Sequence, residues 1–117
     1  KDIKINFQNI SDVEEKRLPP KFEVALFRLV QESVTNALKH AEAKQIDVKF
    51  EVRPNQVNVA IKDDGKGFDI KKVFKEKKES FGLMGMKERV ELLNGKMAVH
   101  SAPGKGTFII IQLPTNL

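Results

Sequence analysis

Every second residue is apolar in three stretches of the chain, residues 3–7, 46–52 and 57–61. Such an alternation of apolar and polar residues predicts strands that turn one face toward a core. A Pro-Asn-Gln sequence separates the last two stretches and favours a turn between them. These two stretches are therefore expected to form a β-hairpin.

Residues 21–41 show a different spacing, with apolar residues three and four positions apart and no Gly or Pro between them. This pattern predicts one long amphipathic helix that begins after the proline pair 19–20. The same spacing returns in residues 82–94, and Gly95 follows as a natural C-terminal stop for a second helix.

The C-terminal part of the chain contains two further predicted strands, at residues 97–99 and 107–113, with a turn at 102–106. Residues 63–81 show no regular period. Because the strands come partly in hairpins and the helices are few, we expect an α+β fold with a mixed or antiparallel sheet and helices on one face. No repeat or second domain is visible, so residues 1–117 are expected to form a single domain.

Composition narrows the classes of function. The chain of 117 residues has no cysteine, which excludes disulfide scaffolds, thiolate catalysis and cysteine-ligated metals. Hydrophobic residues make up 40% and charged residues 32%, the balance of a folded domain. No apolar run approaches the length of a membrane span and no signal peptide opens the chain, so no direct membrane contact is expected.

The net charge of +5 points to an anionic partner, and much of it comes from one segment. Residues 66–79 hold six lysines against three acidic residues. A solvated loop or short helix is one interpretation of this segment. The other is a mobile segment beside an anion, and the neighbouring glycines decide between the two.

Six of the seven glycines fall in three close pairs, Gly65 with Gly67, Gly82 with Gly85, and the pair 104 and 106. The third pair is most simply a hairpin turn. The first two pairs enclose the lysine-rich segment, and long irregular segments within a compact domain are usually functional. We therefore interpret this segment as a lid or docking surface.

Each glycine pair has candidate chemistry beside it. Asp63 follows an apolar strand and can accept a hydrogen bond from a ligand amino group, although an ordinary acidic turn is the simpler interpretation. The Gly82 pair opens a helix, whose first N–H groups and positive dipole end can bind phosphate. Neither signal is specific by itself.

A polar line follows one flank of the long predicted helix. Glu32 and Asn36 carry oxygens suited to Mg²⁺ or its waters, and Lys39 and His40 carry groups suited to phosphate. A solvated helix flank explains the same spacing equally well. Known phosphate motifs fail, because Gly106 follows Lys105 where a P-loop needs Ser or Thr, and no third glycine completes a dinucleotide fingerprint.

Three runs taken in order resemble the ATP-binding catalytic domain of bacterial sensor histidine kinases, within the gyrase, Hsp90, histidine kinase and MutL (GHKL) superfamily. LVQESVTNALKHAEA at 29–43 resembles the N box, and DDGKGFD at 63–69 resembles the first glycine box. FGLMGMKERVELLNGKMAVHSAPGKGTFIIIQLP at 81–114 resembles the second glycine box and the strands after it. The sequence of this third run is similar to that of the subfamily paired with NarL/LuxR-type response regulators.

The resemblance implies a Bergerat-type two-layer α/β sandwich, with a mixed sheet of about five strands and helices on one face. It implies ATP and Mg²⁺ as cofactors. At the adenine end, Asp63 would take the amino group directly and through water, and Gly65 and Gly67 would line the adenine and ribose side. Thr107 would hydrogen-bond the water network around adenine.

At the phosphate end the resemblance implies Asn36 as the Mg²⁺ ligand, with Glu32 near the metal or its water, and Lys39 and His40 near the phosphates. The lid hinge and helix start would be formed by Gly82, Leu83, Gly85 and Met86. This sequence departs from many kinases in having Ser80 at the first position of the second glycine box. Lid closure can therefore differ from that of larger kinases.

The phosphate-accepting histidine of the family lies in an upstream helical dimerisation domain, and neither histidine here fits as its substitute. The resemblance thus implies a cytoplasmic catalytic domain that donates the γ-phosphoryl group of Mg-ATP to that histidine, from which it passes to a response regulator. As an isolated fragment it is expected to bind nucleotide with little kinase activity.

Two alternative functions stay open at this point. A stand-alone serine kinase of the anti-sigma-factor type needs no helical acceptor domain, but the GLMGMKERV wording disfavours it. The basic charge also suits a nucleic-acid-binding module. No Trp or Tyr is available for base stacking and the basic residues alternate with acidic ones, so direct nucleic-acid binding is not expected.

Overall fold

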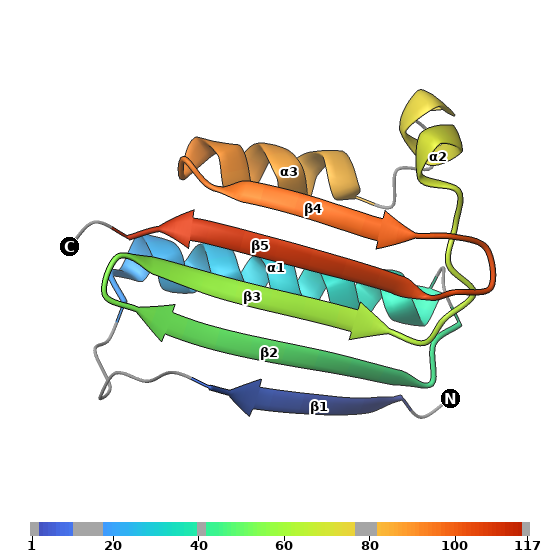
Figure 1. Cartoon of the computed structure of the whole chain (residues 1–117), viewed down its shortest axis with the longest axis horizontal. Coiled ribbons are helices and arrows are strands. Elements are labelled where there is room, and N and C mark those ends of the chain that lie inside the picture. Colours follow the sequence, from blue (N-terminus) through green and yellow to red (C-terminus); the bar gives the residue numbers. More distant parts are fainter. Residues whose placement is uncertain (1–2, 11–17, 40–41, 77–81, 116–117) are drawn as a thin grey trace.

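A computed structural model describes residues 3–10, 18–39, 42–76 and 82–115 of the chain (Figure 1). The described residues form five strands and three helices. In chain order these are β1 Lys4–Asn9, α1 Pro20–Lys39, β2 Gln45–Arg53, β3 Gln56–Asp63, α2 Ile70–Glu76, α3 Leu83–Leu92, β4 Lys96–Ser101 and β5 Thr107–Pro114.

The strands form one mixed sheet in the order β1-β2-β3-β5-β4. β1 runs parallel to β2, and the other neighbouring strands are antiparallel. Because β3 pairs with β5, its last residue, Asp63, lies opposite Thr107 at the start of β5. The mixed sheet and the α+β class agree with the sequence prediction, and two residues 44 positions apart meet at one end of the sheet.

The long helix α1 lies behind the sheet in Figure 1 and closes the core. Proline at its first position costs no backbone hydrogen bond there. The side chains that α1 buries recur at helical spacing: Phe22, Ala25, Leu26, Leu29, Ser33 and Ala37. Four of them, Phe22, Leu26, Leu29 and Ala37, belong to one core cluster. The cluster also contains alternate residues of the central strands, among them Val57, Val59, Ile109 and Ile111, and Leu83, Met86 and Val90 of α3.

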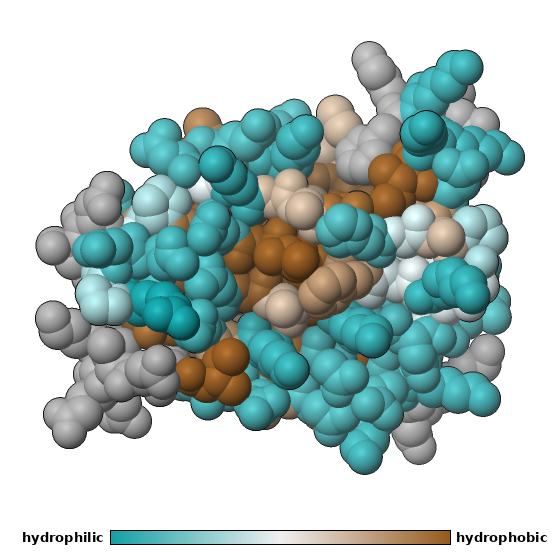
Figure 2. Space-filling view, in the orientation of Figure 1, coloured by the Kyte–Doolittle hydropathy of each residue, from teal (hydrophilic) through white to brown (hydrophobic). Residues whose placement is uncertain are grey.

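The opposite face of the sheet faces the viewer in Figure 2 and is mostly hydrophilic, with an apolar area over the central strands. Ile110 of β5 is 38% exposed and alternates with the buried Ile109 and Ile111, so it belongs to this open face. No helix among the described residues is long and apolar enough to cross a membrane.

One local prediction differs from the structure, and one segment without a visible period forms a short helix, which was among its interpretations. The predicted buried face of β1 is largely exposed, with Ile5 at 49% and Phe7 at 64%, because β1 is the edge strand of the sheet. Residues 70–76, for which no period was visible, form α2. Its start is marked by Asp69, whose carboxylate accepts the N–H of Lys72 at 3.2 Å as a helix cap.

Candidate functional site

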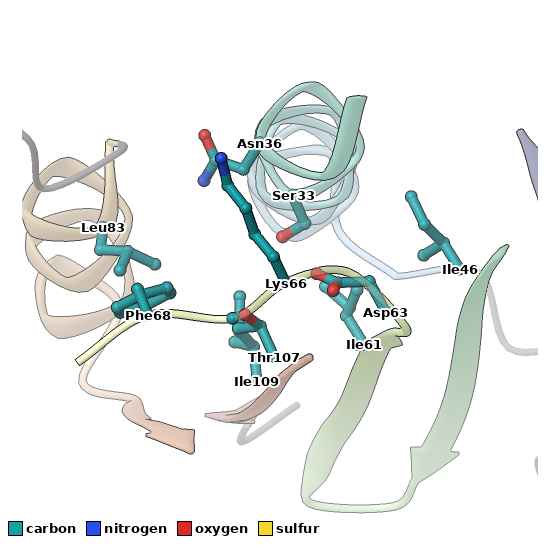
Figure 3. A pocket seen from close by; sticks show the side chains of 11 residues that line it. Ser33, Asn36, Ile46, Ile61, Asp63, Lys66, Phe68, Leu83, Thr107 and Ile109 are labelled. Carbon is teal, nitrogen blue, oxygen red and sulfur yellow. The ribbon is translucent and has the colours of Figure 1, made fainter. Parts of the chain in front are cut away.

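A pocket opens between α1, the first turn of α3, and the adjoining ends of β3 and β5 (Figure 3). Apolar side chains cover much of its wall: Ile46, Ile61, Phe68, Leu83 and Ile109. Five polar side chains also line it: Ser33, Asn36, Asp63, Lys66 and Thr107. An apolar pocket with a few convergent polar groups is the usual form of a small-molecule site.

Asp63 is the acidic group of this pocket and lies half-buried at the end of β3. Burial raises the pKa of its carboxyl group, and the backbone N–H groups of Gly65 and Thr107 act in the opposite direction. The Gly65 N–H donates to Asp63 Oδ1 at 2.8 Å. These contacts hold the carboxylate toward the pocket, where it can accept hydrogen bonds from a ligand.

The loop after Asp63 is tied to its surroundings on both sides. The carboxylate of Asp64 accepts the N–H groups of Lys44 at 2.8 Å and Gln45 at 3.0 Å. Those two hydrogen bonds, Gln45 first, lower the pKa of Asp64. On the other side, the Gly104 N–H donates to the Lys66 carbonyl at 2.6 Å. The first glycine pair therefore sits in a loop with a fixed backbone.

Ser33 also faces the pocket, although the sequence placed it only within the apolar stripe of the helix. It is 5% exposed, and its hydroxyl donates to the Leu29 carbonyl at 2.9 Å. A serine hydroxyl has one proton, so Ser33 can only accept hydrogen bonds from a ligand. An ionised Asp63 has the same restriction, and the two residues together suit a ligand that carries N–H donors.

The predicted polar line on α1 is divided by the structure. Asn36 lines the pocket, whereas Glu32 lines a separate groove between α1 and α3. A step of four residues turns an α-helix by roughly 40° beyond a full turn, which is enough to separate the two side chains. Lys39 is exposed at the last position of α1 and lines neither hollow, and His40 lies outside the described residues.

The second predicted glycine pair lies in that groove. Gly82 and Gly85 line it with Met86, Glu32 and two arginines, Arg28 and Arg89. Gly82 has a φ of 73°, and a Cβ there would overlap the carboxylate of Glu32. Leu83, by contrast, is 1% exposed and faces the first pocket. The start of α3 thus separates the two hollows.

The described part of the lysine-rich segment begins in the pocket wall, with Lys66 and Phe68, and continues into α2. Lys71, Lys72 and Lys75 are exposed there. Residues 77–81, including Ser80, lie outside the described residues. The interpretation of this segment as a lid or docking surface therefore stays a prediction.

The sequence profile of the histidine kinase-, DNA gyrase B- and HSP90-like ATPase domain (HATPase_c) matches residues 22–117. The chain belongs to this ATPase family. The five-stranded mixed sheet with helices on one face is the Bergerat-type (GHKL) sandwich of the family. Membership implies ATP binding.

Its relatives include two kinases named DegS. The chain is 56% identical over 115 residues to the signal transduction histidine-protein kinase/phosphatase DegS of Bacillus subtilis (strain 168), covering 98% of the chain and 30% of the relative. It is 49% identical over 113 residues to DegS of Brevibacillus brevis, covering 96% of the chain and 28% of the relative. The chain thus spans less than a third of the length of these relatives.

Solved histidine kinase structures resemble the chain as well. The blue-light activated histidine kinase of Erythrobacter litoralis EL346 aligns with a TM-score of 0.72 at 25% identity. The alignment covers 99% of this chain and 36% of that one.

Proposed function

We propose that residues 1–117 form the ATP-binding catalytic domain of a DegS-like sensor histidine kinase. The proposal rests mainly on the position of Asp63, whose half-buried carboxylate lies in the wall of an apolar pocket. The three kinase-like sequence runs contribute to this pocket from separate parts of the fold. The names of the relatives and the ATPase family support the assignment.

At the adenine end, the carboxylate of Asp63 accepts a hydrogen bond from the exocyclic amino group of the base, directly and through water. Ile61 and Ile109 supply apolar surface for the rings, as neighbouring residues of the wall. Thr107 completes the polar side of the pocket opposite Asp63 in the sheet register. Gly65 and Gly67 bring the loop backbone close to the base and ribose.

At the phosphate end, Asn36 is the candidate Mg²⁺ ligand. Mg²⁺ is commonly held by one or two protein oxygens together with substrate phosphates and water, and the amide oxygen of Asn36 fits that role. Among the described residues no group of three or more His, Cys, Asp or Glu could hold the metal by itself. Asn36 would hold the metal together with the phosphates of the nucleotide, and the metal would supply charge neutralisation there.

Lys66 adds a protein cation at this end of the pocket. Figure 3 shows its side chain rising from the loop toward Asn36. Glu32 and the α3 start, with Gly82 and Gly85, border the neighbouring groove, where we place the terminal phosphate. Glu32 would lie near the metal or its water. Lys39 and His40 stay candidates for phosphate contact from the end of α1.

In the whole kinase, the γ-phosphoryl group is transferred from Mg-ATP to a histidine nitrogen of a helical dimerisation domain, leaving ADP. The phosphoryl group then passes to an aspartate of a NarL/LuxR-type response regulator. Positioning and charge neutralisation supply most of the catalysis in such transfers. An isolated chain without the acceptor helix should bind ATP and transfer little phosphate.

We expect Asn36→Ala in the complete kinase to reduce phosphorylation of the protein by [γ-³²P]ATP and Mg²⁺ at least tenfold, as removal of a positioned charge-stabilising contact typically does. Asn55→Ala, in the exposed turn between β2 and β3, is the matched control and should retain native labelling. Acid-labile label is the expected product, since phosphohistidine is hydrolysed by acid. Native labelling of the Asn36 variant would contradict the proposal.

The raised pKa of Asp63 predicts that nucleotide affinity depends on pH. The amino group needs an ionised acceptor, so affinity should weaken as pH falls through a pKa above the ordinary aspartate value. Calorimetric titrations of ADP from pH 7.5 downward measure this. The Asp63→Asn variant should bind ADP more weakly than the native chain at neutral pH, and its affinity should no longer fall as the pH is lowered. If the affinity of this variant still falls at low pH, a group other than Asp63 titrates.

Gly85 offers a test of the phosphate end. It lies in α3 with nothing within 4 Å of a Cβ, so Gly85→Ala should raise the free energy of unfolding by about 0.5–1 kcal/mol. If phosphate approaches this backbone, the added methyl group should weaken the binding of ATP more than the binding of adenosine. Thermal melts and calorimetry separate the two effects, and unchanged selectivity between ATP and adenosine would remove Gly85 from the phosphate end.

A further inference from the structure

The hydroxyl of Ser101, the last residue of β4, meets three separate segments of the chain. It accepts a hydrogen bond from the N–H of Phe68, in the loop after Asp63, at 2.9 Å. It donates to the carbonyl of Gly106 in the β4–β5 turn at 2.8 Å. The hydroxyl of Thr107 lies 3.1 Å away at the start of β5. Ser101 itself does not line the pocket, whereas Phe68 and Thr107 do.

The number of protons on these groups fixes the direction of the last contact. A serine hydroxyl has one proton and two lone pairs. The carbonyl of Gly106 can only accept, so it takes the proton of Ser101, and the N–H of Phe68 occupies one lone pair. The remaining lone pair can only receive a proton, and the one proton available is that of Thr107. Thr107 is therefore the donor in this pair.

We propose that Ser101 is a positioning residue that makes the pocket selective for a 6-amino purine. This rests on the proposed nucleotide-binding function. With its proton directed to Ser101, the buried Thr107 presents only lone pairs to the pocket, where it lies opposite Asp63. A ligand edge or bridging water must then donate on this side. Adenine does so with its amino group, whereas a 6-oxo purine places an oxygen there.

Ser33 strengthens the same restriction from the helix side, because its own proton is used on the Leu29 carbonyl. The pocket therefore has three side chains that accept and do not donate: Ser33, Asp63 and Thr107. Removing the Ser101 hydroxyl frees one of them. Thr107 could then turn its proton into the pocket and donate to the oxygen of a 6-oxo purine.

Calorimetric titration with ATP and with ITP, each with Mg²⁺, tests this inference. In Ser101→Ala the ratio of the ITP and ATP dissociation constants should fall roughly three- to tenfold, the effect of about one hydrogen bond. Ser101→Thr keeps a hydroxyl on the same strand and should keep the native ratio. Ser101→Cys, with a sulfur that bonds weakly, provides the same test if the alanine variant does not fold.

A double-mutant cycle with Thr107→Val distinguishes an action through Thr107 from a general loosening of the loops. In the valine background, Ser101→Ala should leave the ITP to ATP ratio unchanged. A further fall in that background would overturn the inference. An equal loss of affinity for ATP and for ITP in Ser101→Ala would also overturn the inference, because it would show a merely structural role for Ser101.

These outcomes are separate from a failure of the proposed function. Adenine selectivity that survives in Ser101→Ala and Ser101→Cys refutes the role of Ser101 and leaves ATP binding intact. A folded native chain that binds neither ATP nor ITP refutes the proposed function, and this inference with it.

Discussion

Replacing Asp63 with alanine should lower the affinity of the chain for ATP by roughly 100-fold, as expected for loss of a hydrogen bond to a charged group and its supported water. The carboxylate is half-buried in an apolar pocket and is oriented by the N–H groups of Gly65 and Thr107. No other described acidic residue lines this pocket. Calorimetry of native and variant chains with Mg-ATP measures the effect.

Asp47→Ala is the matched control for this prediction. Its carboxylate accepts hydrogen bonds from Asn6 and Gln45 at the β1–β2 side of the sheet, outside the pocket. The control variant should bind ATP with native affinity. A folded Asp63→Ala chain with native affinity for ATP would remove Asp63 from the adenine site and with it the main support for the proposed function.

Gly67→Ala should be strongly destabilising, by about 2–4 kcal/mol in the free energy of unfolding. Gly67 has a φ of +64°, which costs any residue with a Cβ, and the new methyl group would overlap the carbonyl oxygen of Ala102 and lie 2.9 Å from that of Gly106. Both obstacles are backbone atoms of the β4–β5 turn, which is tied to the same loop by the Gly104 N–H. Relief therefore requires both loops to shift.

Gly104→Ala separates the two causes of this loss. Gly104 has a similar φ of +77°, but nothing lies within 4 Å of a Cβ there. It should cost only the left-handed backbone penalty, about 1–2 kcal/mol. Urea unfolding of the two variants measures the difference, and equal losses would show that the contact between the two loops is not maintained in solution.

Much of the fold could be predicted because its hydrophobic periods are long and regular. The helix at 21–41 and the hairpin after it correspond to α1, β2 and β3 within a few residues. The exposure of Phe7 could not be predicted, because a period of two shows which residues share a face and not whether a strand lies at the sheet edge. Helix α2 is too short for a period, and its one local signal was the capping Asp69.

Sequence motifs also identified part of the candidate site, whereas the rest depends on three-dimensional geometry. Asp63, Asn36 and Thr107 came from motifs, and the sheet register and α1 bring them to one pocket. Ser33 and Ser101 could not be found in this way, since their importance lies in which atom receives their single proton. Glu32 shares a motif with Asn36 but faces the α1–α3 groove, which only the rotation of the helix reveals.

In the proposed function, the pocket beside Asp63 binds the adenine nucleotide Mg-ATP. Isothermal titration calorimetry of the native chain with ATP, ADP and GTP in the presence of Mg²⁺ tests it most directly. We predict one binding site per chain for ATP and for ADP, with GTP bound far more weakly. A folded chain that shows no saturable binding of ATP or ADP, or that binds GTP equally well, would contradict the account.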